Sequence, residues 1–219
     1  MTLFKTNNMK FIFLKLTLVL MLCQATILVN AQTVKLLNST SKASLRGLCV
    51  VDDKIVWVSG SGGTVGRSLD GGDSWTWMTV KGFEKADFRD IEAFDAKTAI
   101  IMGIASPAYI LKTTDGGTSW NEVFKDTAKE MFLDAMDFWD QNRGVVIGDP
   151  VNGRIFLAQT LDGGDNWREM KTNTFNVDSG EACFASSGTN IKLYSKRKYY
   201  CITGGLNSRL FINGKDIID

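Results

Sequence analysis

Short apolar runs recur along the chain, and polar or glycine-rich segments separate them. Three of these runs end at glycine and cover residues 55–60, 99–103 and 144–148. Another run precedes each of the three, and further short runs follow. Apolar runs of this length, bounded by turn-forming residues, predict β-strands rather than helices. The 21 glycines and only 2 prolines in 219 residues agree with many tight turns between strands.

A polar motif follows these runs and divides the chain into repeats. It reads Ser/Thr-x-Asp-Gly-Gly-x-x-Trp at residues 68–75, 113–120 and 160–167, and its aspartates are 45 and 47 residues apart. Four strands in each unit of about 45 residues is the period of a β-propeller blade. We therefore predict an all-β fold, a β-propeller of four-stranded antiparallel blades. The motif residues to which we assign a structural role are Asp70, Gly71, Gly72, Trp75, Asp115, Gly116, Gly117, Trp120, Asp162, Gly163, Gly164 and Trp167.

Each motif residue has an expected mechanical role. The aspartate accepts hydrogen bonds from backbone N–H groups two or three residues further on, which fixes the turn. The two glycines permit positive φ angles without a Cβ clash. The Ser or Thr two residues before the aspartate ties the loop to the preceding strand, and the Trp ring packs between neighbouring sheets.

A fourth unit begins but lacks the motif. Its strands are predicted at residues 179–184, 199–204 and 208–212, and residues 213–219 follow in place of the motif. We therefore predict a partial propeller over residues 44–219, with about three complete blades plus most of a fourth. The expected blades cover residues of about 44–82, 87–126, 131–172 and 178–212.

An unfinished fourth blade implies an open sheet edge, which invites pairing with another chain. Three outcomes are open. The chain is a shortened gene product that folds poorly, which we favour, or it closes the ring with a second copy or another chain. Otherwise it closes as a compact four-bladed ring, with residues 33–37 supplying a strand.

The first residues have the pattern of a secretory signal. Lys5 and Lys10 precede an apolar run over residues 11–29, and Ala31 completes a small-residue cleavage pattern. We predict a signal peptide at residues 1–31, an N-terminal segment at 32–43, and export to the periplasm or the medium. A membrane anchor is the alternative, although the run is short for a span.

Composition excludes several classes of function. The chain contains no histidine, which removes His-dependent catalytic triads and the common zinc sites. Its net charge of +1 gives no basic field for nucleic acid. We predict no metal site, no cofactor and no catalytic residue. Cys183 and Cys201 either form a disulfide across one hairpin or are, with Cys49, buried thiols.

The motif resembles the Asp-box, or bacterial neuraminidase repeat. The wider pattern is similar to secreted propellers grouped with the photosystem II stability/assembly factor family, through residues 137–140, 148–150 and 179–182. This resemblance implies a non-catalytic scaffold that binds a protein or peptide partner. Asp-boxes also occur in sialidase-like proteins, so a carbohydrate-active enzyme or a carbohydrate-binding module, with a glycan as ligand, is the alternative. Fold alone does not decide between them.

The first strand of each blade lines the central channel of a propeller, so charged residues there are binding candidates. Aligning the four first strands puts Arg46 and Arg89 in one column with Leu133 and Gly180. The next column contains Gly47, Asp90, Asp134 and Glu181, and a later one contains Cys49, Glu92, Met136 and Cys183. The channel-mouth candidates are therefore Arg46, Arg89, Asp90, Glu92, Asp134 and Glu181. The alternative is that these charges pair between blades and only stabilise the ring.

Overall fold

The structure is a computed structural model that divides into two compact units, Met1–Leu37 and Asn38–Asp219. It describes residues 15, 34–36, 41–104, 106–170, 176–186, 188–195 and 198–212, and the backbone alone of residues 215–218. The predicted signal peptide at residues 1–31 lies outside the described residues, apart from Lys15. Among the helices of the described part, none is both long enough and apolar enough to cross a membrane.

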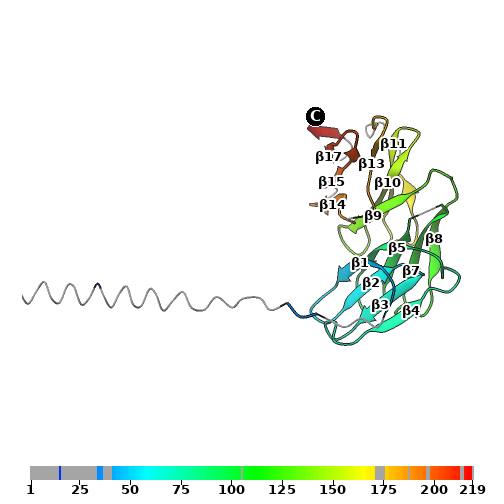
Figure 1. Cartoon of the computed structure of the whole chain (residues 1–219), viewed down its shortest axis with the longest axis vertical. Coiled ribbons are helices and arrows are strands. Elements are labelled where there is room, and N and C mark those ends of the chain that lie inside the picture. Colours follow the sequence, from blue (N-terminus) through cyan, green and yellow to red (C-terminus); the bar gives the residue numbers. More distant parts are fainter. Residues whose placement is uncertain are drawn as a thin grey trace, which may run out of the picture. The chain divides into compact units, whose positions relative to one another are not determined.

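The second unit consists of antiparallel sheets whose strands follow one another in sequence (Figure 1). The first sheet contains β1 (Leu45–Val50), β2 (Val56–Gly60), β3 (Thr64–Ser68) and β4 (Thr76–Thr79). The second contains β5 (Phe88–Ala93), β6 (Ala99–Gly103), β7 (Ala108–Thr113) and β8 (Asn121–Asp126). The third contains β9 (Leu133–Phe138), β10 (Gly144–Val151), β11 (Arg154–Thr160) and β12 (Arg168–Glu169). The predicted all-β, four-stranded blades are confirmed.

The fourth sheet differs from the prediction in two ways. Its order is β14 (Ile191–Tyr194), β15 (Lys198–Ile202), β17 (Leu210–Ile212) and β18 (Lys215–Ile218), so a fourth strand is present without an Asp-box before it. The predicted first strand at residues 179–184 is reduced to β13 (Glu181–Ala182), which pairs with β16 (Gly204–Gly205). Only Thr203 separates β15 from β16, so β13 and β14 are two parts of one inner strand, interrupted by residues 183–190.

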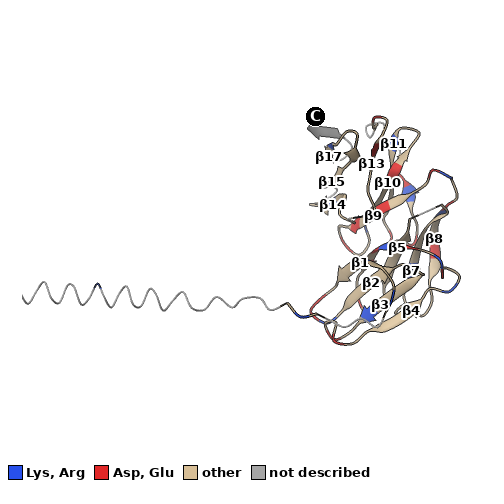
Figure 2. Ribbon diagram, in the orientation of Figure 1, with Lys and Arg blue, Asp and Glu red and all other residues tan. Residues whose placement is uncertain are grey.

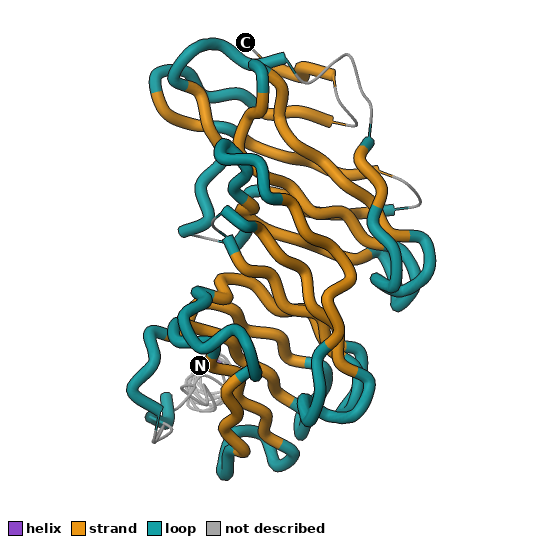
Figure 3. Tube along the Cα trace, turned by 90° about the vertical axis from the view of Figure 1, so that its right-hand side faces the viewer, coloured by secondary structure: helices purple, strands orange, loops and turns teal. Residues whose placement is uncertain are grey.

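Neighbouring sheets pack face to face and bury three apolar clusters. Trp57 and Val65 of the first sheet meet Ile91 of the second in one cluster. Equivalent clusters join the second sheet to the third and the third to the fourth. The inner strands touch in the order β1, β5, β9 and β14, and Figure 3 shows the resulting succession of strands. This is the arrangement of propeller blades.

The three Asp-boxes adopt one shared hydrogen-bond pattern. In the second blade, the Asp115 carboxylate accepts bonds from the Ser119 backbone N–H at 2.9 Å and its hydroxyl at 2.6 Å. Thr113 Oγ1 donates to Asp115 at 2.8 Å and accepts the N–H of Gly117 at 2.9 Å. The same bonds recur around Asp70, and around Asp162 the side-chain amide of Asn166 donates in place of a hydroxyl. The aspartate thus accepts hydrogen bonds within the turn, as expected, but from the residue four positions on, not two or three.

The second glycine of a box also sets how closely two blades approach. Gly117 has a φ of 88°, and a Cβ there would lie 2.7 Å from Met78 Sδ in the first sheet. Gly164 has a φ of 84°, and a Cβ there would lie 2.3 Å from Ile100 Cδ1 in the second sheet. Side chains other than hydrogen are therefore excluded both by backbone conformation and by space.

Two of the three Trp rings lie between blades, as predicted. Trp120 packs on the cluster between the first and second sheets, and Trp167 belongs to the cluster between the second and third. Trp75 of the first sheet instead stacks on Trp77, with ring centroids 5.5 Å apart. The cysteines at positions 49, 183 and 201 are free; Cys183 and Cys201 are buried thiols as in the second alternative, whereas Cys49 is only partly buried.

Replacing Asp115 by alanine is expected to lower the melting temperature by on the order of 5 °C, because the Ser119 donors lose their acceptor. Circular dichroism measures the transition. Lys97→Ala, at an exposed residue of the neighbouring β5–β6 turn, is the control and is expected to melt like the wild type. Equal melting temperatures for both variants would contradict the role of Asp115 in fixing the turn.

Candidate functional site

The pairing of the inner strands fixes which candidates share a position. Leu45, Phe88 and Leu133 each lie opposite a glycine of the second strand of their sheet, namely Gly60, Gly103 and Gly148. The next residue in each strand, Arg46, Arg89 or Asp134, has no Cα partner because the register shifts there. Asp134 therefore occupies the position of the two arginines.

The sequence alignment of the third blade was wrong by one residue. The residue of the third blade equivalent to Asp90 is Ala135, not Asp134, and the residue equivalent to Glu92 is Asp137, not Met136. A one-residue slip moves every side chain to the opposite face of the sheet. The same bulge occurs in all three inner strands, so the offset comes from the residue that opens the third strand, which is Leu133 and corresponds to Leu45 and Phe88.

Asp90 joins the second blade to the third. Its Oδ2 accepts the backbone N–H of Met136 at 2.7 Å, and its Oδ1 accepts the N–H of Ile91 at 2.9 Å. Burial raises the pKa of Asp90 to about 7, although both hydrogen bonds favour the charged form. Both oxygens are thus committed to the backbone, which supports the ring-stabilising interpretation for this residue.

Asp137 plays the same part between the third and fourth blades, and sequence reasoning missed it as a candidate. Its Oδ2 accepts the N–H of Leu193 at 2.7 Å and lies 2.9 Å from the Lys192 ammonium. Its only signal in the sequence was an acid near the end of a first strand, as at Glu92. Burial and the charges of Asp90 and Asp137 raise the pKa of Glu92 to about 8.

Asp134 is fully buried, and neither oxygen accepts a hydrogen bond from a residue that the structure describes. Burial, followed by the negative charge of Asp149, raises its pKa to about 8; the nearby N–H of Ala185 and the charge of Arg89 offset this in part. The segment that interrupts the inner strand of the fourth blade lies next to Asp149, because Cys183 donates its N–H to Asp149 Oδ1 at 3.0 Å. Asp134 is therefore an interior residue rather than a surface ligand.

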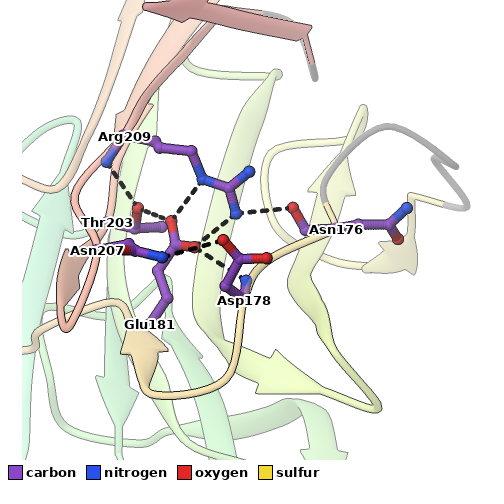
Figure 4. Close-up of polar contacts among 6 residues, drawn as sticks. All are labelled: Asn176, Asp178, Glu181, Thr203, Asn207 and Arg209. Carbon is purple, nitrogen blue, oxygen red and sulfur yellow. Dashed lines mark hydrogen bonds and ion pairs between the residues drawn. The ribbon is translucent and has the colours of Figure 1, made fainter. Parts of the chain in front are cut away.

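Glu181 is the centre of a buried network in the fourth blade (Figure 4). Arg209 donates from Nε to Oε1 at 3.0 Å and from Nη2 to Oε2 at 2.5 Å. The Thr203 hydroxyl and the N–H of Asp178 also donate to this carboxylate. Burial opposes the charge of Glu181, but these donors together hold its pKa below the ordinary value. Arg209 is a second residue that sequence reasoning missed.

The two arginine candidates lie nearer the surface. Arg46 is exposed, and Arg89 is half-buried with its Nε 3.0 Å from Asp87 Oδ2. Of the six candidates, the structure thus places Asp90, Asp134 and Glu181 in the interior and Glu92 in a partly buried position. The arginines sit where β1 and β5 begin, and we call this end of the inner strands the entrance face.

Pockets open along the entrance face where one blade connects to the next. One of about 530 Å³ lies between residues 82–87 and the β6–β7 hairpin, and Phe83, Pro107 and Tyr109 give it an apolar lining. Another of about 580 Å³ lies between the third and fourth blades and is lined by Glu130, Asp149, Asp178 and Glu181. Figure 2 shows the acidic positions along β9, β10 and β13. The face therefore carries exposed Arg46 near one end and carboxylates at the other.

No protein-family model and no curated protein matches this sequence. Solved structures match its fold. A structure described as YCF48 bound to D1 peptide has a TM-score of 0.54 and 18% identity, over 82% of this chain and 55% of that one. An ancestral GH74 enzyme has 0.52 and 15%, over 84% and 28%. The WD40 β-propeller domain of Doa1 has 0.51 and 16%, over 82% and 55%. These likenesses confirm a β-propeller, and the chain spans about half the length of that YCF48 structure.

Proposed function

We propose that the propeller is a non-catalytic scaffold that binds a protein or peptide segment along the entrance face. The observation that carries the proposal is the succession of pockets on that face, with an apolar lining near Phe83 and Tyr109 and charge at both ends. Separate hollows along one face suit an extended chain, whose side chains enter successive pockets. The YCF48 structure of the same fold is bound to a peptide, which supports this choice of ligand class.

The carbohydrate-active alternative requires two carboxyl groups that flank a glycosidic bond. Asp90 uses both oxygens on backbone N–H groups, Asp134 is fully buried, and Glu181 is held by Arg209. These commitments favour binding over catalysis. Export through residues 1–31, with Gln32 as the first mature residue, and the absence of a cofactor remain predictions.

Replacing Arg46 by glutamate is expected to weaken peptide binding about tenfold, because it reverses an exposed charge on the entrance face. Peptides selected from a displayed library on the purified chain serve as ligands, and fluorescence anisotropy measures their affinity. Arg89→Ala is expected to act in the same direction. Lys97→Glu, on an exposed turn between β5 and β6, is the control and is expected to bind like the wild type.

Equal peptide affinity in all three variants would contradict the entrance-face site. Turnover of chromogenic glycosides that is abolished by Glu92→Gln or Glu181→Gln would contradict the scaffold function altogether. In that case the carbohydrate-active alternative would replace it.

A further inference from the structure

The first blade presents to solvent a face that the other blades bury. Leu48 is 65% exposed, whereas the equivalent residues Ile91 and Met136 are 1% and 2% exposed. Val50 is 62% exposed, and its equivalent Ala93 is 8% exposed. In the second and third blades this face of the inner strand packs on the blade before it. We call this surface of the first blade, Leu48 and Val50, its leading face.

The fourth blade presents the opposite face. Tyr199 and Cys201 of β15 point to the third blade, and the alternating residues Tyr200 and Ile202 are 36% and 48% exposed. In the second blade the corresponding side of β6, with Ile100 and Met102, is fully buried against the third blade. Tyr200 stacks on Tyr194 of the neighbouring strand β14, with ring centroids 4.6 Å apart. We call this surface of Tyr194, Tyr200 and Ile202 the trailing face.

Each contact between consecutive blades within the unit joins a trailing face to a leading face. The contact occurs three times, through the three apolar clusters. A hydrogen bond also joins the inner strands of the two blades each time. Ala93 donates its N–H to Cys49 Sγ at 3.3 Å, Met136 donates to Asp90, and Leu193 donates to Asp137. Among the described residues, one leading face and one trailing face of this repeated interface are therefore left exposed.

We propose that the trailing face of one copy packs on the leading face of a second copy, and that two such contacts close a ring of eight blades. The trailing face of each copy packs on the leading face of the other, and a twofold axis relates the two contacts. Head-to-tail contacts form a closed ring when the rotation from one copy to the next leads back to the first copy. Eight four-stranded blades lie within the range of propellers. This proposal is independent of the proposed function, because it uses the end faces of the blade series and not the entrance face.

Light scattering of the full chain during size-exclusion chromatography tests the proposal. The wild type is expected to have twice the mass of one chain at micromolar concentration. Leu48→Glu on the leading face and Ile202→Lys on the trailing face are each expected to halve that mass. Leu161→Lys, at an apolar residue 65% exposed within the third Asp-box, is the control and is expected to remain dimeric. Circular dichroism checks that each variant is folded.

Mixing the two monomeric variants distinguishes this arrangement from others. The mixture restores one unaltered interface, and the introduced charges of opposite sign meet at the second, so the dimer mass is expected to return. A monomeric wild type would overturn the proposal. Loss of the dimer in only one variant would also overturn the proposal, because a contact between two identical faces gives that result. Failure of the mixture to restore the dimer would overturn it as well, because contacts elsewhere on the surface give that result.

Discussion

Replacing Arg209 by methionine is expected to lower the free energy of unfolding by about 3–5 kcal/mol, because the change leaves the Glu181 charge buried without its partner. The Glu181 side chain is fully buried, and that of Arg209 is 17% exposed. Three further polar contacts, from Thr203, Asp178 and Asn176, depend on the positions of these two groups. Urea denaturation measures the loss.

Arg143→Met is the matched control for this prediction. Arg143 Nη2 also lies 2.5 Å from a carboxylate oxygen, that of Asp140, but both side chains are more than a third exposed. Exposed pairs contribute little, because water and salt screen them. Comparable losses of unfolding free energy in the two variants would show that the contribution of the Glu181–Arg209 pair does not come from its burial.

The Glu181 pair also has an expected pH dependence. The pKa of Glu181 is lower in the folded state than its ordinary value, so the stabilisation is present above the ordinary pKa. It is lost as the pH falls through the folded-state pKa. The difference in stability between the wild type and Arg209→Met is therefore expected to shrink in acid.

Replacing Asp134 by asparagine is expected to stabilise the protein at alkaline pH and to have a smaller effect near pH 4. The pKa of Asp134 rises from an ordinary 3.8 to about 8 in the folded state, so the folded chain holds a proton that the unfolded chain releases. Stability therefore falls as the pH rises between these values. Asparagine at this position has no ionisable proton, so the variant lacks this fall in stability with rising pH.

Urea denaturation at several pH values between 4 and 9 measures the effect. Asp90 and Glu92 have raised pKa values of about 7 and 8, so part of the same downward slope is expected to remain in the variant. Asp53→Asn, at an exposed turn residue, controls for the removal of one acid and is expected to keep the wild-type slope. A slope in Asp134→Asn as steep as in the wild type would show that Asp134 is not a protonated interior residue.

The raised pKa values and the inter-blade bonds have one origin. Inner strands of a propeller converge, so their acids lie close together and away from water. Asp90 and Asp137 find backbone N–H donors in the next blade, whereas Asp134 finds none among the described residues. Of the four acids selected as a binding cluster, Asp90 bonds to the next blade, Asp134 is an interior acid, Glu181 pairs with Arg209 and Glu92 is partly buried, so the surface candidates are the arginines.

Some features of this fold could be predicted because a local interaction determines them. The Asp-box closes its turn with bonds that span only four residues, such as Thr113 to Gly117 and Asp115 to Ser119. Repetition of this closed unit at a fixed spacing implies repeated blades. The positive φ angles of Gly117 and Gly164 were predicted from the motif, although the contacts of these glycines with the preceding blade were not.

The sequence by itself determined the class of fold, the blade period and the three locked turns, because each depends on hydrogen bonds and strand patterns within a few residues. Only the tertiary structure decided the strand register at Asp134, the roles of Asp137 and Arg209, and the divided inner strand of the fourth blade. Those depend on the pairing of whole strands, on an inserted segment and on partners 28 to 56 residues away in sequence, as for Glu181 with Arg209 and Asp137 with Leu193. Burial of a charge is likewise a property of the packed blades, and no single segment encodes it.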